Sequence, residues 1–367
     1  MRALALASLL ALPWQLIAAE CQWPAWERYH QAMMSEDGRI IDRSSAQLIT
    51  TSEGQSYAMF FALVANDRAS FDKLVRWTSN NLAGGDLSQQ LPAWQWGRDD
   101  EGQWRVLDSN NATDSDLWIA YSLLEAGRLW DEPGYTRLGT EMLWRTTAQS
   151  LRVVPDLGLM LLPGDRGFET SEGWRFNLSY LPPQLLQRFA QIAGVWAELT
   201  TNSHQLMLLG SPKGFAPNWL HWRIGEGVHI PEDQAQGSYD AIRVYLWIGM
   251  LAPQAPGRAE LLSHFQPMLE QTRSQGLPPE AVDSLSGEPQ GRGPAGFSAA
   301  LLPMLQALEG YDDQLNAQRE RLIQHPPAED AYYNQSLLLF GQGWDEQRYR
   351  FDEAGRLQPA WTAPCHN

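Results

Sequence analysis

Residues 111–124 read NATDSDLWIAYSLL, and this segment decides how the rest of the chain is interpreted. It places two carboxylates, Asp114 and Asp116, in the first turn of an apolar helix. Paired acids can supply the proton transfers that split a glycosidic bond. The chain also has 17 tryptophans, whose flat apolar faces can stack on pyranose rings. The combination indicates sugar chemistry.

Composition excludes several classes of partner. The 367 residues are 44% hydrophobic, so the chain can bury a large core, and its formal net charge is -16. Nucleic acids and anionic lipid surfaces both need a basic protein face, so neither is expected as a partner. A neutral polymer fits this charge better.

The first residues have the layout of an export signal. Residues 1–19 carry one positive charge, then a leucine-rich run, then small residues, which is typical of a secretory signal peptide. We therefore expect residues 20–367 to form a single domain that is periplasmic or secreted and has no membrane anchor. Cys21 and Cys365, the two cysteines, flank this domain, and an oxidising compartment favours a disulfide between them over two free thiols.

Hydrophobic periodicity predicts an all-α protein. About twelve helices separated by Gly- and Pro-rich loops suggest one toroidal (α/α)6 barrel, with a two-domain helical protein as the alternative. Short extended segments at 38–41, 104–107 and 153–162 are expected as small hairpins on one face of the barrel. The expected helices span 23–34, 52–66, 70–82, 113–129, 135–149, 184–193, 196–209, 239–251, 259–274, 297–308, 313–323 and 329–340.

Two other helix starts repeat the acidic pattern of residues 111–124. Glu53 precedes one apolar run and Asp240 another, each beside small residues. Each acid taken singly can simply complement a helix dipole. In an α/α barrel, however, alternate helices begin at the same rim, so Glu53, Asp114 and Asp240 can converge. Clustered carboxylates partly covered by aromatic residues let one stay protonated while another is ionised, as glycoside hydrolysis requires.

Further residues are candidates for binding the sugar chain. Trp94 and Trp96 are two positions apart, so in an extended segment both point to the same side, although they can equally plug an end of the barrel. Arg243 lies one helical turn after Asp240 and can pair with a carboxylate, either in the site or as a purely structural ion pair. The remaining substrate-binding candidates are Asp116, Tyr180, Tyr239 and Tyr332.

Other chemistries find little support. The seven histidines are scattered and no pair has metal-ligand spacing, so we expect no metal and no other cofactor. Residues 291–296 match the letters of the dinucleotide pattern G-x-G-x-x-G, but no strand precedes them and Pro294 interrupts them. The chain has no P-loop and no G-x-S-x-G motif.

Several motifs resemble family 8 of the glycoside hydrolases. They are ATDSD at 112–116 with IAYSLL at 119–124, TTSEGQSY at 50–57, SYLPP at 179–183, SYDAIRVY at 238–245 and FGQGW at 340–344. The resemblance covers essentially the whole chain after residue 19. It implies an (α/α)6 barrel and inverting hydrolysis of internal bonds in a β-1,4-glucan. Because the motifs look like those of family members that accompany a bacterial cellulose synthase, that complex is a candidate partner.

The resemblance also implies a role for each acid. Glu53 takes the position of the proton donor and Asp240 that of the base that activates water. Asp114 takes the position of an active-site aspartate that is sometimes labelled the nucleophile; since an inverting reaction forms no glycosyl-enzyme, we expect it to hold and distort the reactive sugar, with Asp116 supporting it. Ser115 stands where the family usually has Gly or Ala, which leaves the geometry at Asp114 open.

Two alternatives remain at this stage. A glucan-binding accessory protein of a cellulose-export complex could use the same barrel to grip the polymer without useful turnover. The same barrel could also act on xylan or chitosan. Retention of both Glu53 and Asp240 favours an enzyme, because binding alone needs neither.

Overall fold

The computed structural model describes residues 22–362. The expected signal peptide and both Cys21 and Cys365 lie outside these residues, so the export signal and the disulfide stay predictions. In the described part of the chain, no helix is long and apolar enough to cross a membrane.

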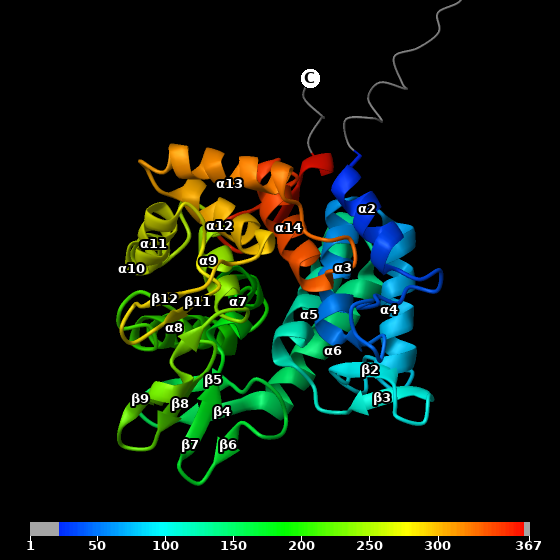
Figure 1. Ribbon diagram of the computed structural model, residues 1–367. Coiled ribbons are helices and arrows are strands. Elements are labelled where there is room, and N and C mark those ends of the chain that lie inside the picture. Colours follow the sequence, from blue (N-terminus) through cyan, green and yellow to red (C-terminus); the bar gives the residue numbers. More distant parts are fainter. Residues whose placement is uncertain (1–21, 363–367) are drawn as a thin grey trace, which may run out of the picture.

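Six helices form a closed inner ring (Figure 1). Each packs against the next in chain order, and the last closes on the first. They are α3 (Ser52–Val64), α5 (Thr113–Leu129), α7 (Pro183–Ala190), α9 (Ile242–Gly249), α12 (Ala295–Ala307) and α14 (Tyr332–Asp345).

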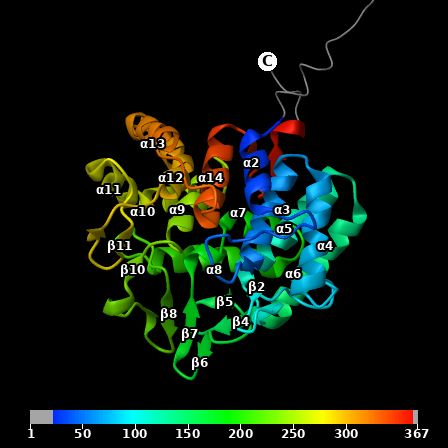
Figure 2. The same ribbon diagram turned by 45° about the vertical axis from the view of Figure 1, so that its right-hand side comes forward.

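An outer layer of helices covers this ring, and each inner helix packs against an outer one (Figures 1 and 2). The outer helices that follow their inner partners are α4 (Arg68–Leu82), α6 (Pro133–Ser150), α8 (Gly194–Leu209), the pair α10 (Arg258–Phe265) and α11 (Pro267–Gln275), and α13 (Asp312–Gln324). The first helix, α2 (Pro24–Met33), instead packs on α14, the last. The (α/α)6 barrel predicted from the sequence is therefore confirmed.

The burial pattern explains which helices lie inside. In α3 every residue except Glu53 is buried, so this helix can lie only in the interior. In α4 the buried residues instead follow helical spacing along one stripe, including Phe71, Leu74 and Thr78, as a surface helix requires. Aromatic rings from four inner helices meet inside the ring: Phe60, Trp118, Trp247 and Phe340 have neighbouring centroids 5.0–5.5 Å apart.

Small antiparallel sheets lie mainly at the end where the inner helices begin, along the lower edge of Figure 1. They comprise β1 (Thr50–Thr51), β2 (Gln95–Arg98) and β3 (Trp104–Asp108); β4 (Leu151–Val154) and β5 (Gly158–Leu161); β6 (Glu169–Thr170), β7 (Gly173–Phe176), β8 (Leu220–Arg223) and β9 (Gly227–His229); and β10 (Gln236–Gly237), β11 (Ala281–Asp283) and β12 (Pro289–Gln290). The hairpins expected at 104–107 and 153–162 are among them.

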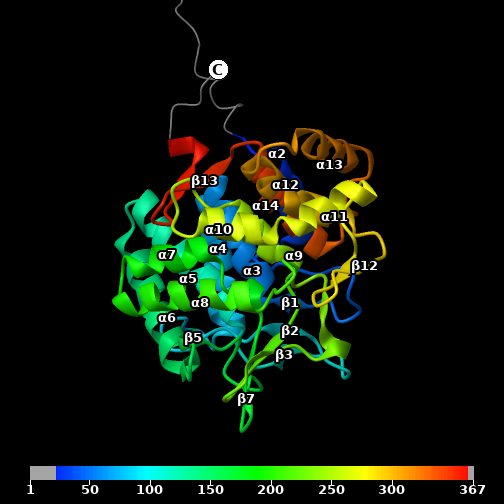
Figure 3. The same cartoon turned by 90° about the vertical axis from the view of Figure 1, so that its left-hand side faces the viewer.

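One hairpin lies at the opposite end of the barrel. It consists of β13 (Tyr349–Phe351) and β14 (Leu357–Pro359), and Figure 3 shows β13 far from β7. The sequence analysis did not predict it. The segment expected at 38–41 forms no strand, but only an isolated bridge between Ile40 and Met34.

Helix boundaries differ from the expectation in two places that have clear causes. The helix expected at 259–274 is divided into α10 and α11, because Pro267 has no amide hydrogen to continue the first helix and begins the second instead. The helix expected to begin at 239 begins at Ile242, since Ser238–Ala241 form a tight turn in which the Ile242 amide donates to the Ser238 carbonyl (2.9 Å). Asp240 therefore precedes its helix.

Candidate active site

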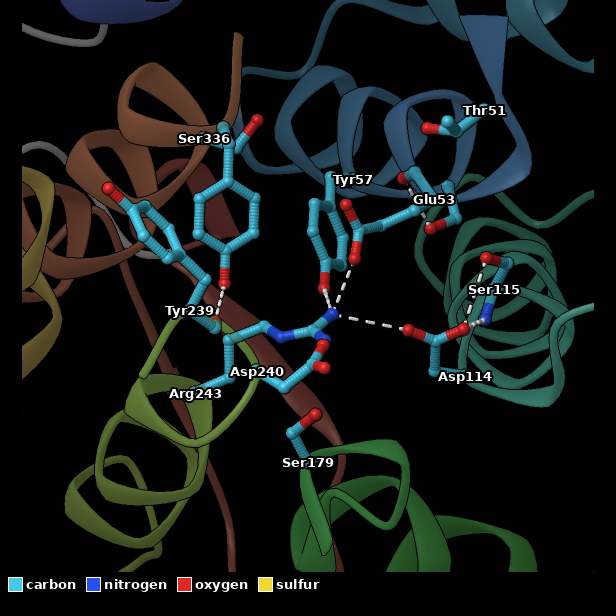
Figure 4. Close-up of polar contacts among 12 residues, drawn as sticks. Thr51, Glu53, Tyr57, Asp114, Ser115, Ser179, Tyr239, Asp240, Arg243 and Ser336 are labelled. Atoms are coloured by element: carbon cyan, nitrogen blue, oxygen red, sulfur yellow. Dashed lines mark hydrogen bonds and ion pairs between the residues drawn. The ribbon is translucent and has the colours of Figure 1, made fainter. Parts of the chain in front are cut away.

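The Arg243 side chain connects the three acids that the sequence analysis singled out (Figure 4). Its Nη1 donates to Glu53 Oε2 and, over 3.2 Å, to Asp114 Oδ2, while its Nη2 donates to Asp240 Oδ1 over 2.7 Å. Arg243 is only 2% exposed. One buried guanidinium thus holds carboxylates from the first turns of α3 and α5 and from the turn that precedes α9.

The start of α3 positions Glu53. Thr51 caps the helix, because its side chain accepts a hydrogen bond from the Gly54 backbone amide (3.0 Å). A Cβ at Gly54 would lie 3.1 Å from the Tyr332 ring, so this glycine leaves room for Tyr332. The Tyr332 hydroxyl donates to Glu53 Oε1 over 2.8 Å. Both carboxylate oxygens of Glu53 therefore accept hydrogen bonds.

Asp114 is the most buried of the three acids at the cluster. It is 2% exposed, whereas the side chains of Glu53 and Asp240 are 21% and 32% exposed. Burial raises the pKa of Asp114 to about 7; the Arg243 charge opposes this shift, and the negative charges of Glu53 and Asp240 add to it. Asp114 therefore exchanges a proton near neutral pH, while Glu53 and Asp240 face the accessible part of the site.

Ser115 supports Asp114 directly. The Asp114 Oδ1 atom accepts from the Ser115 amide (2.7 Å) and from the Ser115 hydroxyl (3.2 Å). A Gly or Ala at this position would retain the first bond and lack the second. The Ser115 hydroxyl thus adds one hydrogen bond to Asp114.

Asp116 lies behind the cluster and does not contact Arg243. It is fully buried, and its Oδ2 accepts a hydrogen bond from the side-chain Nδ2 of Asn111 over 2.6 Å. Its Oδ1 has no hydrogen-bond partner within residues 22–362. Burial raises the pKa of Asp116 well above its ordinary value. The Asn111 Oδ1 atom in turn accepts a hydrogen bond from the Asp165 backbone amide (2.8 Å). This bond connects the loop before α5 to the loop around residue 165.

Aromatic side chains extend from the cluster. Tyr180 lies with its ring 5.7 Å from the Arg243 guanidinium carbon, and its other neighbour is Trp219, at a centroid distance of 5.9 Å. Trp219 also stacks on Phe168, with 5.7 Å between centroids and an interplanar angle of 10°. Tyr239 is 45% exposed, and its backbone carbonyl accepts from the Tyr333 hydroxyl.

Trp94 and Trp96 differ in their secondary structure, because only Trp96 belongs to strand β2. Trp94 lies outside β2, and a bulge separates Gln95 from Trp96. The Trp96 ring stacks on Trp104 at 5.1 Å and meets the edge of Trp77 from α4 at 5.4 Å. The structure does not bring Trp96 into contact with the carboxylate cluster. Its sugar-binding role stays a prediction, and so does that of Trp94.

Sequence reasoning missed three residues near the cluster. Tyr57, whose hydroxyl accepts from Arg243 Nη1 (3.0 Å), lies one turn after Glu53 on the same helix, so the spacing could have indicated it. Asn111 and Trp219 lie in loops whose sequence carries no comparable signal. Within residues 22–362 no group of three or more His, Cys, Asp or Glu side chains is arranged to hold a metal ion.

Known proteins resemble this chain along nearly its whole length. The family description "Glycosyl hydrolases family 8" matches residues 2–347. An endoglucanase of Salmonella typhi is 52% identical over 348 residues, covering 95% of this chain and 93% of the relative. An endoglucanase of Escherichia coli (strain K12) is 49% identical over 352 residues, covering 96% and 95%. The crystal structure of an endo-1,4-D-glucanase from Vibrio fischeri ES114 superposes with a TM-score of 0.88 at 43% identity, covering 93% of this chain and all of that one.

Proposed function

The chain belongs to family 8 of the glycosyl hydrolases, and from this premise we propose that it is an endo-β-1,4-glucanase that cleaves internal bonds of a glucan chain. The observation that carries this conclusion is the set of ion pairs around Arg243, which brings Glu53, Asp114 and Asp240 to one end of the barrel. A barrel that only gripped the polymer would need no such group of acids.

We infer that the reaction inverts the anomeric carbon. Inversion needs one acid to protonate the leaving oxygen and one carboxylate to activate a water. Glu53 and Asp240 bind different nitrogens of the same guanidinium and are both partly exposed, so each is accessible to substrate or water. We assign Glu53 as the proton donor and Asp240 as the base.

The charges in the cluster suggest where a proton resides before the substrate binds. Three carboxylates surround one guanidinium, so full ionisation would leave two uncompensated negative charges in a largely buried site. Asp114, with its pKa near 7, is the acid that relieves this charge by taking up a proton. Glu53 accepts hydrogen bonds at both oxygens, so its work as an acid requires one of these contacts to open when the sugar binds.

We assign Asp114 to holding the reactive sugar. Asp114 is the least exposed of the three acids, which favours Asp240 over it as the base, and it lies 3.2 Å from the guanidinium that also holds Glu53 and Asp240. A hydrogen bond from Asp114 to a sugar hydroxyl would fix the reactive ring between the acid and the base. Tyr180 is positioned to contact the same ring, because it borders Arg243.

We further propose that the enzyme acts outside the cytoplasm during cellulose synthesis. The composition of residues 1–19 supports export, and the full-length similarity to enterobacterial endoglucanases supports a β-1,4-glucan as the substrate. Contact with a cellulose synthase complex remains the most specific part of this proposal. Co-purification from detergent-solubilised membranes of the source organism would test it.

The activity is tested with soluble carboxymethyl-cellulose. We expect the wild-type protein to lower the viscosity quickly while releasing few reducing ends, as internal cleavage does. Glu53→Gln should lower the rate by about 10²- to 10⁴-fold, the usual contribution of an acid catalyst. Glu36→Gln is the matched control, since Glu36 is an exposed turn residue away from the site. Equal rates for Glu53→Gln and Glu36→Gln would remove Glu53 from the mechanism.

A further inference from the structure

Arg175, on strand β7, is a cation without an anionic partner. Among the residues that the structure describes, no carboxylate lies within ion-pair distance of its guanidinium, and its buried Nε has no hydrogen-bond partner. The guanidinium instead lies 4.1 Å from the centre of the Trp219 ring. Other arginines in residues 22–362 also lack an ion pair, but Arg175 differs from them because its Nε is buried without a hydrogen-bond partner, which costs free energy unless a partner is supplied.

The surrounding sheet face carries further basic side chains. Arg175 pairs in register with His221 on β8, and His221 pairs with His229 on β9, so the three side chains lie on one face of the sheet. Burial lowers the pKa of His221, and the charge of Arg175 lowers it further. His221 and His229 therefore add no negative charge that could neutralise Arg175.

The same face forms the floor of a pocket. Its volume of about 580 Å³ falls in the range of small-molecule sites. Its lining is mainly polar: Arg175, Asn218, Trp219, His221, Asp233, Gln234 and Gln236. Asp233 is exposed to solvent and makes no ion pair with Arg175 within 4 Å. A ligand entering this pocket would thus meet one cation, Arg175, and one exposed carboxylate, Asp233, that is not paired with it.

The pocket adjoins the carboxylate cluster. Trp219 lines the pocket and contacts Tyr180, which in turn borders Arg243. The negative charge of Asp240 acts on Arg175 and raises its pKa, against the effect of burial. A glucan chain held at Asp240 would therefore extend a neighbouring sugar residue past Trp219 towards Arg175.

We propose that this pocket binds an anionic substituent, a carboxylate or a phosphate, carried by the glucan residue next to the reactive sugar. This inference rests on the proposed glucanase function. A guanidinium offers donors in a planar fork that matches carboxylate and phosphate oxygens. Neutral hydroxyl groups could accept its hydrogen bonds but would leave the charge uncompensated. Arg175 is accordingly a specificity-determining residue that favours acidic over neutral glucans.

The test compares three soluble polymers of similar degree of substitution: carboxymethyl-cellulose, cellulose phosphate and neutral hydroxyethyl-cellulose. Each is assayed with wild type, Arg175→Gln and the control Arg223→Gln. Arg223 lies on β8 of the same sheet, forms an ion pair with Glu226 and does not line the pocket, so the control removes an equal charge from the sheet without changing the pocket lining. Binding is measured in parallel by calorimetry in the Glu53→Gln background, which needs no turnover.

We expect Arg175→Gln to raise KM for the anionic polymers by roughly tenfold, the usual worth of a hydrogen bond to a charged group, and to leave KM for hydroxyethyl-cellulose within about twofold. A larger effect on carboxymethyl-cellulose would indicate a carboxylate site, and a larger effect on cellulose phosphate would indicate a phosphate site. An equal loss on all three polymers, or no loss on any, would overturn the proposal. If wild type cleaved no polymer, the proposed function would fail, and the calorimetry would still decide whether Arg175 selects acidic chains.

Discussion

Asp114 lies 3.2 Å from the Arg243 guanidinium, and yet its pKa is raised to about 7 from an ordinary value of 3.8. A cation at this distance normally lowers the pKa of an acid. Here burial and the negative charges of Glu53 and Asp240 outweigh the Arg243 charge. The site thus holds a proton close to Glu53 and Asp240, the two carboxylates to which we assign the reaction.

This raised pKa makes stability depend on pH in a definite direction. Between about pH 4 and 7, Asp114 is protonated in the folded protein and ionised in the unfolded chain, so folding takes up a proton. The free energy of unfolding therefore falls as pH rises through this window, by up to about 1.4 kcal/mol per unit. Asp114→Asn removes the dependence. We expect the melting temperature of Asp114→Asn, relative to wild type, to rise from pH 4.5 to pH 7; a constant difference would contradict the assignment.

Arg243 cannot be replaced by lysine without loss. A single ammonium group cannot bind three carboxylates as the guanidinium fork does. We expect Arg243→Lys to lower kcat at least about a hundredfold and to destabilise the fold by about 3 kcal/mol, because an uncompensated charge is left buried. Activity on carboxymethyl-cellulose and thermal melting measure both effects. Arg223→Lys is the control on an exposed arginine, and near-normal kcat in Arg243→Lys would show that the three acids need no shared cation.

The stereochemistry of the product tests the assignment of Asp240. If Asp240 activates a water opposite Glu53, the first product released from a cello-oligosaccharide carries an α-anomeric reducing end. Proton NMR during the first minutes, before mutarotation, distinguishes the anomers. Asp240→Asn should lower kcat by about 10²- to 10⁴-fold. A β-anomer as the first product would assign a retaining route and a nucleophile in place of the base.

Asp116 is expected to tolerate replacement of its carboxyl group by an amide. Burial raises the pKa of Asp116 well above the ordinary value, which favours the neutral form of the carboxyl group. Asp116→Asn should change the free energy of unfolding by less than about 1 kcal/mol, whereas Asp116→Ala leaves the Asn111 amide unpaired and should cost about 1–3 kcal/mol. Denaturant unfolding at pH 7 compares the two. If Asp116→Asn is as damaging as Asp116→Ala, the carboxylate is ionised.

The sequence predicted the barrel well because its inner helices carry a strong local signal. Apolar runs such as that of α3 can only be buried, and acids before such runs mark the rim where the inner helices start. Trp96 shows where this reasoning stops. The local sequence around Trp96 is compatible both with a sugar-binding surface and with a packed aromatic cluster. The orientation of the Trp96 side chain is set by the β-bulge and by contacts with Trp77 and Trp104, which depend on other parts of the chain.

The placement of Asp240 was predicted only in part. Local sequence favours a helix from 239, and the acid at its start was expected on the first turn. The Asn218 side chain instead accepts hydrogen bonds from the Ser238 and Ala241 amides (2.8 and 3.2 Å), which holds residues 238–241 in a turn. Since Asn218 lies 20 residues before Ser238, no local pattern could have revealed this contact.

Glycine at 341 is required by a close approach between the backbones of α12 and α14. A Cβ at this position of α14 would lie 1.8 Å from the Ala299 carbonyl oxygen of α12, and backbone cannot rotate away as a side chain can. Gly341→Ala must therefore push two inner helices apart and open the core beside Phe340. We expect a loss of more than about 4 kcal/mol, or no folded protein, in thermal and denaturant unfolding.

Gly194→Ala is the matched control for this change. Gly194 begins α8 in the outer layer, and a Cβ there meets no atom within 4 Å. Alanine has the higher helix propensity, so Gly194→Ala should leave stability unchanged or raise it by up to about 1 kcal/mol. If Gly341→Ala melted as Gly194→Ala does, α12 and α14 would have to be free to separate without disturbing the ring.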